Sequence, residues 1–473
     1  MTIIDRYNKQ EIEGPNEIRQ AQFSDTHEYI IDSEGQKVDF DDPRIVFVSP
    51  EARNPYGKRL VIDLYKKYNR NIRIADETDK NTLQYAKKIC SGRECLPCTA
   101  ITGEILKDIH ENRDESEITL YRTPIDQHGP CQNGAWPVVW KTFAKRLNVK
   151  NAIFYAFPKY SNNYLGLNAD LLVWENISYA IGHYITEARN ALQCVAEDKD
   201  LAIKIFEEIT DECIDNIKLG KKTLRTGLLG WAKKITKIPR KAKVEEIPKI
   251  LIFGGLNLMF DHYPLEQFFL EKGIIAKVVD IVESMNILLA ESIIRFGFKK
   301  GLMSPKEQFD ETLLDASDFS ENDIKEAERA NRSRNAMNFL NSQCEMFRRI
   351  MSKSGLLFDS DANFVDLLEK GHRYVSCNSF TETPLITGRF LHSVEEGIYD
   401  GLINLGTFNC QPAMNSQAII RPLANKYEIP YAAIDCEGPW ISTTQRRLLE
   451  TVAVQAIRVR RRKNEEAKNL NRN

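Results

Sequence analysis

The sequence predicts an α/β protein with two doubly wound, Rossmann-like lobes joined by helices. Short apolar runs rich in β-branched residues alternate with amphipathic helix patterns in both halves of the chain, which is typical of parallel sheets covered by helices. Several of these runs lead into loops that contain cysteine, and open α/β sheets bind ligands beyond the carboxyl ends of their strands. The length of 473 residues allows two such lobes with additional helices.

The first half of the chain supplies the first lobe. Residues 1–43 are polar and are interpreted as an N-terminal extension, with a hairpin across HEYIIDSEGQKVDF. Residues 44–167 form the first α/β lobe, in which RIVFVSPEA, NIRIAD and NAIFYAFP are predicted strands. RLVIDLYKKY and NTLQYAKKI are its predicted helices, and the cysteine loops GRECLPC and GPC belong to this lobe.

The second half begins with a helical region and a basic linker over residues 168–245. Residues 246–465 form the second α/β lobe, which opens with the βαβ pattern KILIFGG, PLEQFFLEKG and IIAKVVD. Helices are expected over about 320–353 and 360–370. Three strand–loop units, YVSCNSF, GLINLGTFNCQP and YAAIDCEGP, precede a last amphipathic helix, and residues 466–473 form a polar tail.

The composition excludes several classes of partner. A net charge of −2 provides no overall field for nucleic acid or membranes, so we expect neither as a partner. The most apolar run, residues 281–298, contains Glu283, Glu291 and Arg295 and is not expected to span a membrane. The N-terminus MTIIDRYNKQEIEG lacks the pattern of a secretory signal, so we expect a cytoplasmic location. No GxxxxGK[ST] loop is present, which argues against nucleotide hydrolysis by a P-loop.

Ten cysteines are the main clue to function. Structural disulfides are disfavoured in a reducing cytosol, where clustered cysteines more often bind metal or carry out redox chemistry. Cys194, Cys213 and Cys344 lie in helix-like contexts and are expected to be small buried apolar residues. The other seven lie in loops, mostly beside Gly or Pro: Cys90, Cys95, Cys98, Cys131, Cys377, Cys410 and Cys436.

Seven loop cysteines drawn from two lobes predict an iron–sulfur cluster, because thiolates are the usual ligands of such clusters. The spacing of Cys90, Cys95, Cys98 and Cys131 also matches the plant-type 2Fe–2S pattern. Helix patterns on both sides of the first loop argue against the small β fold that accompanies that pattern. A structural zinc site is a second alternative, although seven thiolates exceed the four that one site needs.

Three blocks of sequence resemble a known protein group. They are NTLQYAKKICSGRECLPCTAITGEIL, QHGPCQNGAW and GTFNCQP…PYAAIDCEGPW…TQRRLLETV, in that order. Together they resemble the iron–sulfur, non-ATPase component of the 2-hydroxyacyl-CoA dehydratase and benzoyl-CoA reductase superfamily over roughly residues 44–465. The match is closest to the portion fused downstream of activase modules in large activase-related proteins, and the double-cubane cluster proteins belong to the same superfamily.

The resemblance implies two α/β domains with an iron–sulfur cluster between them. It also implies a separate homodimeric activase-type ATPase, which carries its own 4Fe–4S cluster and supplies an electron for a difficult reduction or a radical dehydration. The substrate is an unidentified small molecule, and a homodimer of this chain is compatible with the resemblance. The cofactor is a 4Fe–4S cluster or an 8Fe–9S double cubane, which takes three cysteines from each domain.

The resemblance also suggests which cysteines are ligands. Cys95, Cys131 and Cys410 match the family motifs directly, whereas Cys98, Cys377 and Cys436 complete a three-plus-three set by their loop positions. Cys90 is a weaker candidate because it follows a helix pattern closely.

Other residues near the cysteines are candidates for proton transfer. His128 and Glu94 are close in sequence to Cys131 and Cys95 and could relay protons. The alternatives are that His128 caps a turn and that Glu94 pairs with an arginine.

Two departures from the family pattern leave other functions open. GGLNLMFDHYP replaces a GEIYVR-like stretch, and Asp435, Cys436 and Glu437 replace an Asp-Glu-His run. An electron-transfer protein without its own substrate and a zinc-stabilised scaffold therefore remain alternatives.

Overall fold

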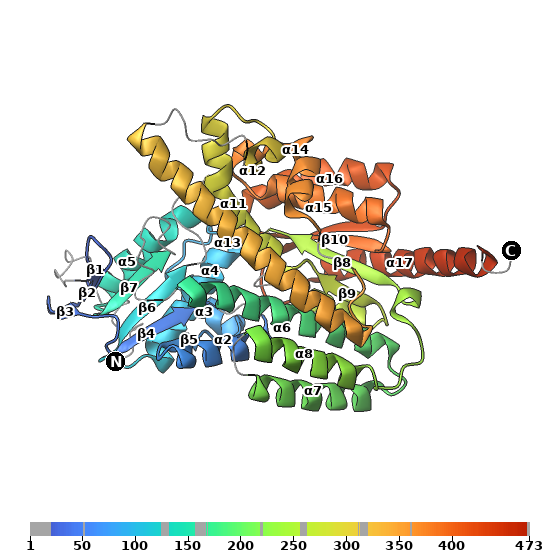
Figure 1. Ribbon diagram of the computed structural model, residues 1–473, viewed down its shortest axis with the longest axis horizontal. Coiled ribbons are helices and arrows are strands. Elements are labelled where there is room, and N and C mark those ends of the chain that lie inside the picture. Colours follow the sequence, from blue (N-terminus) through green and yellow to red (C-terminus); the bar gives the residue numbers. More distant parts are fainter. Residues whose placement is uncertain are drawn as a thin grey trace. The chain divides into compact units, whose positions relative to one another are not determined.

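The computed structural model divides the chain into two compact units, each with its own parallel sheet (Figure 1). The first unit comprises residues 1–53 and 61–175, and the second comprises residues 54–60 and 176–473. Two parallel four-stranded sheets with many helices confirm the predicted α/β class. The structure describes residues 20–50, 53–123, 132–156, 167, 169–217, 221–255, 263–310, 312, 320–359 and 362–470.

The sheet of the first unit has the order β5-β4-β6-β7, and all its neighbouring strands are parallel. Its strands are β4 (Ile45–Ser49), β5 (Asn71–Ile74), β6 (Ile118–Thr123) and β7 (Ala152–Ala156). The chain adds β5 on one side of β4 and then β6 and β7 on the other side. The switch in direction lies between β4 and β6, where sheets of this kind form their binding crevices.

The first unit confirms most of its predicted elements. Its helices are α2 (Pro55–Lys67), whose first turn belongs to the second unit, α3 (Lys80–Lys87), α4 (Leu96–Lys107) and α5 (Trp136–Arg146). Helix α4 continues as the single π-helical turn η1 (Asp108–Asn112), and η2 (Gln132–Ala135) precedes α5. The polar extension contains a small antiparallel sheet, β1 (Gln22–Phe23), β2 (Ile30–Ile31) and β3 (Lys37–Val38), which confirms the predicted hairpin.

The sheet of the second unit has the order β11-β10-β8-β9 and is also entirely parallel. Its strands are β8 (Lys249–Gly254), β9 (Ile275–Val278), β10 (Gly401–Thr407) and β11 (Tyr431–Cys436). Numbered along the chain, both sheets therefore have the order 2-1-3-4, and the switch point here lies between β8 and β10. Helix α16 (Gln411–Lys426) covers one face of β10 and α17 (Thr443–Leu470) covers the other (Figure 1).

The remaining helices lie mainly in the second unit. The predicted helical region is α6 (Ala169–Val195), which begins in the first unit, followed by α7 (Lys199–Asn216) and α8 (Lys221–Ile235). The others are α10 (Tyr263–Leu270), α11 (Ile281–Lys299), α12 (Pro305–Phe309), α13 (Glu321–Met351), α14 (Phe364–His372) and α15 (Thr383–Glu396). Among the described residues, no helix is long and apolar enough to cross a membrane.

Two segments have a different secondary structure from the one predicted. YVSCNSF is not a strand but contains the short 3₁₀ turn η6 (Cys377–Ser379) between α14 and α15. These two helices pack directly against each other, and the segment between them is a short turn instead of an extended strand. The predicted tail from residue 466 is helical as far as Leu470, because α17 continues through it.

A buried ionic cluster joins the helical region to the second sheet. Lys277 at the end of β9 lies 3.3 Å from Glu187 of α6 and also contacts Asp359. Arg348 of α13 donates to both oxygens of Glu187, at 2.9 and 3.1 Å, and Tyr399 donates to Asp359. Each of these side chains is at least about nine-tenths buried, so every charge depends on its partners.

Candidate functional site

Three cysteines gather where α3 is followed by α4. The backbone N–H of Cys90 donates to Ala86 at the end of α3, at 2.7 Å. Cys95 is the N-cap of α4 and Cys98 lies in its first turn. All three belong to the first unit, and Cys95 and Cys98 are buried.

A glycine allows α3 and α4 to pack closely enough for this arrangement. A Cβ atom on Gly103 of α4 would lie only 2.2 Å from the carbonyl oxygen of Thr82 in α3. Any other residue at position 103 would separate the two helices. The close packing therefore holds the loop with Cys90 beside the first turns of α4.

The three thiols influence one another. Burial, followed by the charges that Cys95 and Cys90 would carry as thiolates, raises the pKa of the Cys98 thiol well above its ordinary value. Burial and the Glu94 carboxylate raise the pKa of Cys90 to about 11. Without a cation the Cys90 and Cys98 thiols are therefore protonated at neutral pH, and a bound metal would reverse this preference because it deprotonates its thiol ligands.

Glu94 organises the loop that precedes α4. Its carboxylate accepts hydrogen bonds from the backbone N–H groups of Ser91, Gly92 and Arg93 at 3.0 to 3.1 Å and from the Ser91 hydroxyl at 3.0 Å. Partial burial would raise the pKa of Glu94, but the hydrogen bonds from Ser91 and its neighbours lower it below the ordinary value. Glu94 is thus an ionised acceptor of loop hydrogen bonds, and its role as a proton relay stays a prediction.

Two threonines follow the cysteines along α4. Thr99 and Thr102 follow Cys95 and Cys98 by four residues, which places each one helical turn further along α4. Burial raises the pKa of the Cys90 and Cys98 thiols, and the nearby Thr102 hydroxyl opposes this rise in both. Sequence reasoning missed these residues, although the C-x-x-C-T-x-x-T spacing was a readable signal.

Two further cysteines lie at the carboxyl edge of the second sheet. Cys436 is the last residue of β11 and is paired in register with Thr407, the last residue of β10. Cys410 is the N-cap of α16, and its N–H donates to the Thr407 carbonyl at 3.1 Å. The prediction that both cysteines lie where strands end is confirmed.

Cys377 lies in a different environment from the other loop cysteines of the second unit. It is 3% exposed within an apolar cluster that includes Phe364 and Leu367 of α14. Its thiol lies 3.4 Å from Gln308 Oε1, and its backbone N–H donates to His372 Nδ1 at 3.1 Å. Burial raises the pKa of this thiol to about 11. The expected position at a strand end is wrong, while a role as a ligand stays a prediction.

Two candidate residues, Cys131 and His128, lie outside the described residues. Within the described part of the chain, no group of three or more Cys, His, Asp or Glu side chains is arranged as a metal site. Cys90, Cys95 and Cys98 are thus close enough for electrostatic interaction but are not held in the geometry of metal ligands.

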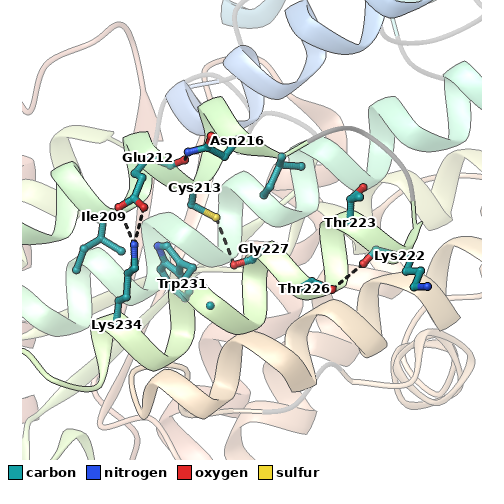
Figure 2. A pocket seen from close by; sticks show the side chains of 12 residues that line it. Ile209, Glu212, Cys213, Asn216, Lys222, Thr223, Thr226, Gly227, Trp231 and Lys234 are labelled. Carbon is teal, nitrogen blue, oxygen red and sulfur yellow. Dashed lines mark hydrogen bonds and ion pairs between the residues drawn. The ribbon is translucent and has the colours of Figure 1, made fainter.

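The three cysteines expected to be structural lie in helices. Cys194 in α6 and Cys344 in α13 are buried, as predicted. Cys213 in α7 is only half-buried and lines a cavity of about 450 Å³ between α7 and α8, where its thiol lies 3.6 Å from the Gly227 carbonyl oxygen (Figure 2). The helical region and basic linker (residues 168–245) contribute two lysines to this cavity. Lys222 lies at one end, and Lys234, paired with Glu212 at 2.7 Å, lies at the other (Figure 2).

Comparisons with known proteins add no assignment. A scan against protein-family models finds no match to this chain, and a search of curated proteins finds none. The family resemblance therefore rests on the sequence motifs alone.

Proposed function

We propose that this chain is a cytoplasmic iron–sulfur protein that accepts low-potential electrons in an ATP-dependent reductase or dehydratase system. In this proposal a separate activase-type ATPase, with its own 4Fe–4S cluster, donates the electron. The observation that supports it most is the gathering of Cys90, Cys95 and Cys98 at the start of α4. Iron–sulfur clusters are bound by sets of thiolates, and a helix N-terminus favours the ionised form of cysteine.

The N-terminus of α4 favours ionised cysteines, against the effect of burial on Cys90 and Cys98. Cys95 and Cys98 lie at the N-terminus of α4, where unsatisfied N–H groups and the helix dipole stabilise negative charge. The thiols of the first unit would disfavour one another's ionisation, and a cationic cluster would stabilise them as thiolates. The cluster, when bound, would take up and release an electron, while the loop and α4 would hold its ligands.

The full proposal uses three thiolates from each unit. The first unit would contribute Cys95, Cys98 and Cys131, with Cys90 as an alternative to one of these. The second unit would contribute Cys377, Cys410 and Cys436. Cys410 and Cys436 share one sheet edge, whereas Cys377 would have to exchange its contact with Gln308 for a metal ligand bond.

Metal analysis of anaerobically purified protein tests the proposal. Iron, acid-labile sulfide and zinc are quantified per chain, with an absorption spectrum before and after dithionite. Each bound 4Fe–4S cube contributes about four irons. Cys377→Ala distinguishes a cluster that uses Cys377 from one that does not, because the substitution lowers the iron content only if this cysteine is a ligand. Stoichiometric zinc without iron would replace the redox proposal with a zinc-stabilised scaffold.

The partner requires a separate experiment. A purified activase-type ATPase, ATP and a low-potential reductant are mixed with the iron-loaded chain, and cluster reduction is followed by its absorption. We expect reduction only when both the ATPase and ATP are present. Equal reduction without ATP would favour an ordinary electron-transfer protein.

A further inference from the structure

The cavity between α7 and α8 of the second unit has the size and the lining of a small-molecule site (Figure 2). Its volume is about 450 Å³, and its apolar wall includes Trp231, Ile209 and Ile217. The indole N–H of Trp231 donates to the Thr210 hydroxyl at 3.0 Å, and its ring packs edge-on against Phe206. The apolar wall is therefore formed before any ligand binds.

The two glycines that α8 contributes to the cavity wall differ in their surroundings. A Cβ atom on Gly227 would lie 2.8 Å from the Ile217 side chain, so close packing explains this glycine. A Cβ atom on Gly230 would meet no heavy atom within 4 Å, although this residue lines the cavity. Glycine inside a helix is destabilising relative to alanine. The open space at Gly230 is therefore kept at a cost in stability, which is typical of binding surfaces.

The two ends of the cavity differ in charge. Lys234 contacts both carboxylate oxygens of Glu212 at 2.7 Å, so the charge at that end is balanced. Lys222 lies exposed at the other end, and no carboxylate within the described residues pairs with it. Among the described lining residues, Lys222 is thus the cation that is available to a ligand.

We propose that this cavity binds a small organic carboxylate with an apolar body. The apolar body would lie against Trp231 and over Gly230, and the carboxylate would pair with Lys222. A single lysine acts as a point charge and suits a monovalent carboxylate, whereas phosphate groups are usually held by several donors. The site is independent of the proposed iron–sulfur function and uses none of its cysteines.

Isothermal titration calorimetry with decanoate tests the site, and decanol serves as the uncharged counterpart. Both compounds are used below the concentration at which decanoate forms micelles. Gly230→Leu places a side chain in the cavity and favours the helix. Lys222→Met removes the charge and keeps an apolar side chain of similar length. Lys233→Met is the matched control, because Lys233 is exposed on the same helix and is not a lining residue.

We expect the wild type to bind decanoate more tightly than decanol. Lys222→Met should weaken decanoate binding about two- to fivefold, which is the range of an exposed ion pair, and should leave decanol binding unchanged. Gly230→Leu should abolish the binding of both compounds, and Lys233→Met should change neither. Thermal unfolding without ligand should show that Gly230→Leu is at least as stable as the wild type.

Two results would overturn the proposal: no binding of decanoate to the wild type, or undiminished binding to Gly230→Leu. Equal wild-type affinities for decanoate and decanol would overturn the pairing with Lys222. If Gly230→Leu does not fold, alkylation of Cys213 by iodoacetamide gives the decision, because this thiol lines the same cavity. Burial raises the pKa of Cys213 to about 12, so the reaction is run at about pH 9 to obtain enough thiolate. Decanoate should slow the alkylation, and an unchanged rate would overturn the proposal.

Discussion

The two units use the same backbone plan for different cysteine arrangements. Both sheets have the strand order 2-1-3-4, and in both a pair of packed helices, α3 and α4 or α14 and α15, precedes the third strand. The second helix of each pair contains the tripeptide Ile-Thr-Gly, at residues 101–103 and 386–388. Each glycine permits a close crossing, since a Cβ on Gly103 or Gly388 would lie 2.2 or 1.8 Å from a carbonyl oxygen.

The two units differ in the side chains that lie around the helix crossing. In the first unit the crossing supports three neighbouring thiols, and the Thr102 hydroxyl accepts a hydrogen bond from Trp140. In the second unit Thr387 is fully buried, and its hydroxyl has no hydrogen-bond partner within the described residues. Cys377 there lies in an apolar cluster, and the other two cysteines lie at strand ends. The same type of helix pair is thus polar and rich in sulfur in the first unit, where cysteines and a hydrogen-bond donor lie next to it.

The largest expected effect is a loss of stability from a substitution in the second unit. Arg348→Met removes a buried cation and leaves Glu187 and Asp359 without one of their partners, which should cost about 3–5 kcal/mol of unfolding free energy. Arg349→Met is the control, because Arg349 is exposed and pairs with Glu345 on the same helix. Urea unfolding measures both, and an equal effect of the two substitutions would contradict a structural role for the buried cluster.

The next effect tests whether the two helix crossings are equivalent. Gly103→Ala and Gly388→Ala should each destabilise the fold by roughly 1–3 kcal/mol, since the new methyl group would overlap a carbonyl oxygen. Gly230→Ala in α8 should instead stabilise by roughly 0.5–1 kcal/mol, because its Cβ would have no heavy atom within 4 Å. Thermal unfolding gives the stabilities.

The two glycine variants should differ in metal binding. Gly103→Ala should lower the iron content, because it separates the helices that bring Cys90 beside Cys98, whereas Gly388→Ala should lower it less. A reversed order would assign the main metal site to the second unit.

The smallest effect concerns the loop that Glu94 organises. Its folded pKa is lowered, so the carboxylate contributes stability above its ordinary pKa of 4.5 and loses that contribution as the pH falls through the lower folded value. Glu94→Gln should therefore increase hydrogen exchange at Ser91, Gly92 and Arg93 at pH 7, with a cost under about 1 kcal/mol. The difference from wild type should shrink below pH 4, and a constant difference would contradict this explanation.

Much of the fold followed from local patterns. Cys410 and Cys436 were predicted at strand ends because an apolar run and turn residues surround each of them, and this signal is contained in a few consecutive residues. Strand β6 was not predicted. The strand predicted around Cys377 is wrong, because this segment is a short turn between two packed helices. Whether a short β-branched segment pairs depends on its neighbours in space, which a local pattern does not specify.

The thiol cluster itself depends on tertiary packing. The position of Cys90 beside Cys98 follows from the crossing at Gly103, and the buried Thr102 hydroxyl is held by Trp140, which is 38 residues away in the chain. Sequence spacing identified Cys95 and Cys98 as candidates but gave Cys90 a lower place. The helix crossing places Cys90 close enough to Cys98 for electrostatic interaction, which the spacing did not specify.

The most direct test of the account is the iron and sulfide content of Cys98→Ser compared with Cys194→Ser. Both cysteines are buried in helices, but only Cys98 lies beside other thiols. Protein is purified anaerobically, and iron, acid-labile sulfide and zinc are measured per chain. We predict that wild type and Cys194→Ser bind the same iron and sulfide, while Cys98→Ser loses most of both. Unchanged iron in Cys98→Ser, or zinc in place of iron in wild type, would contradict the account.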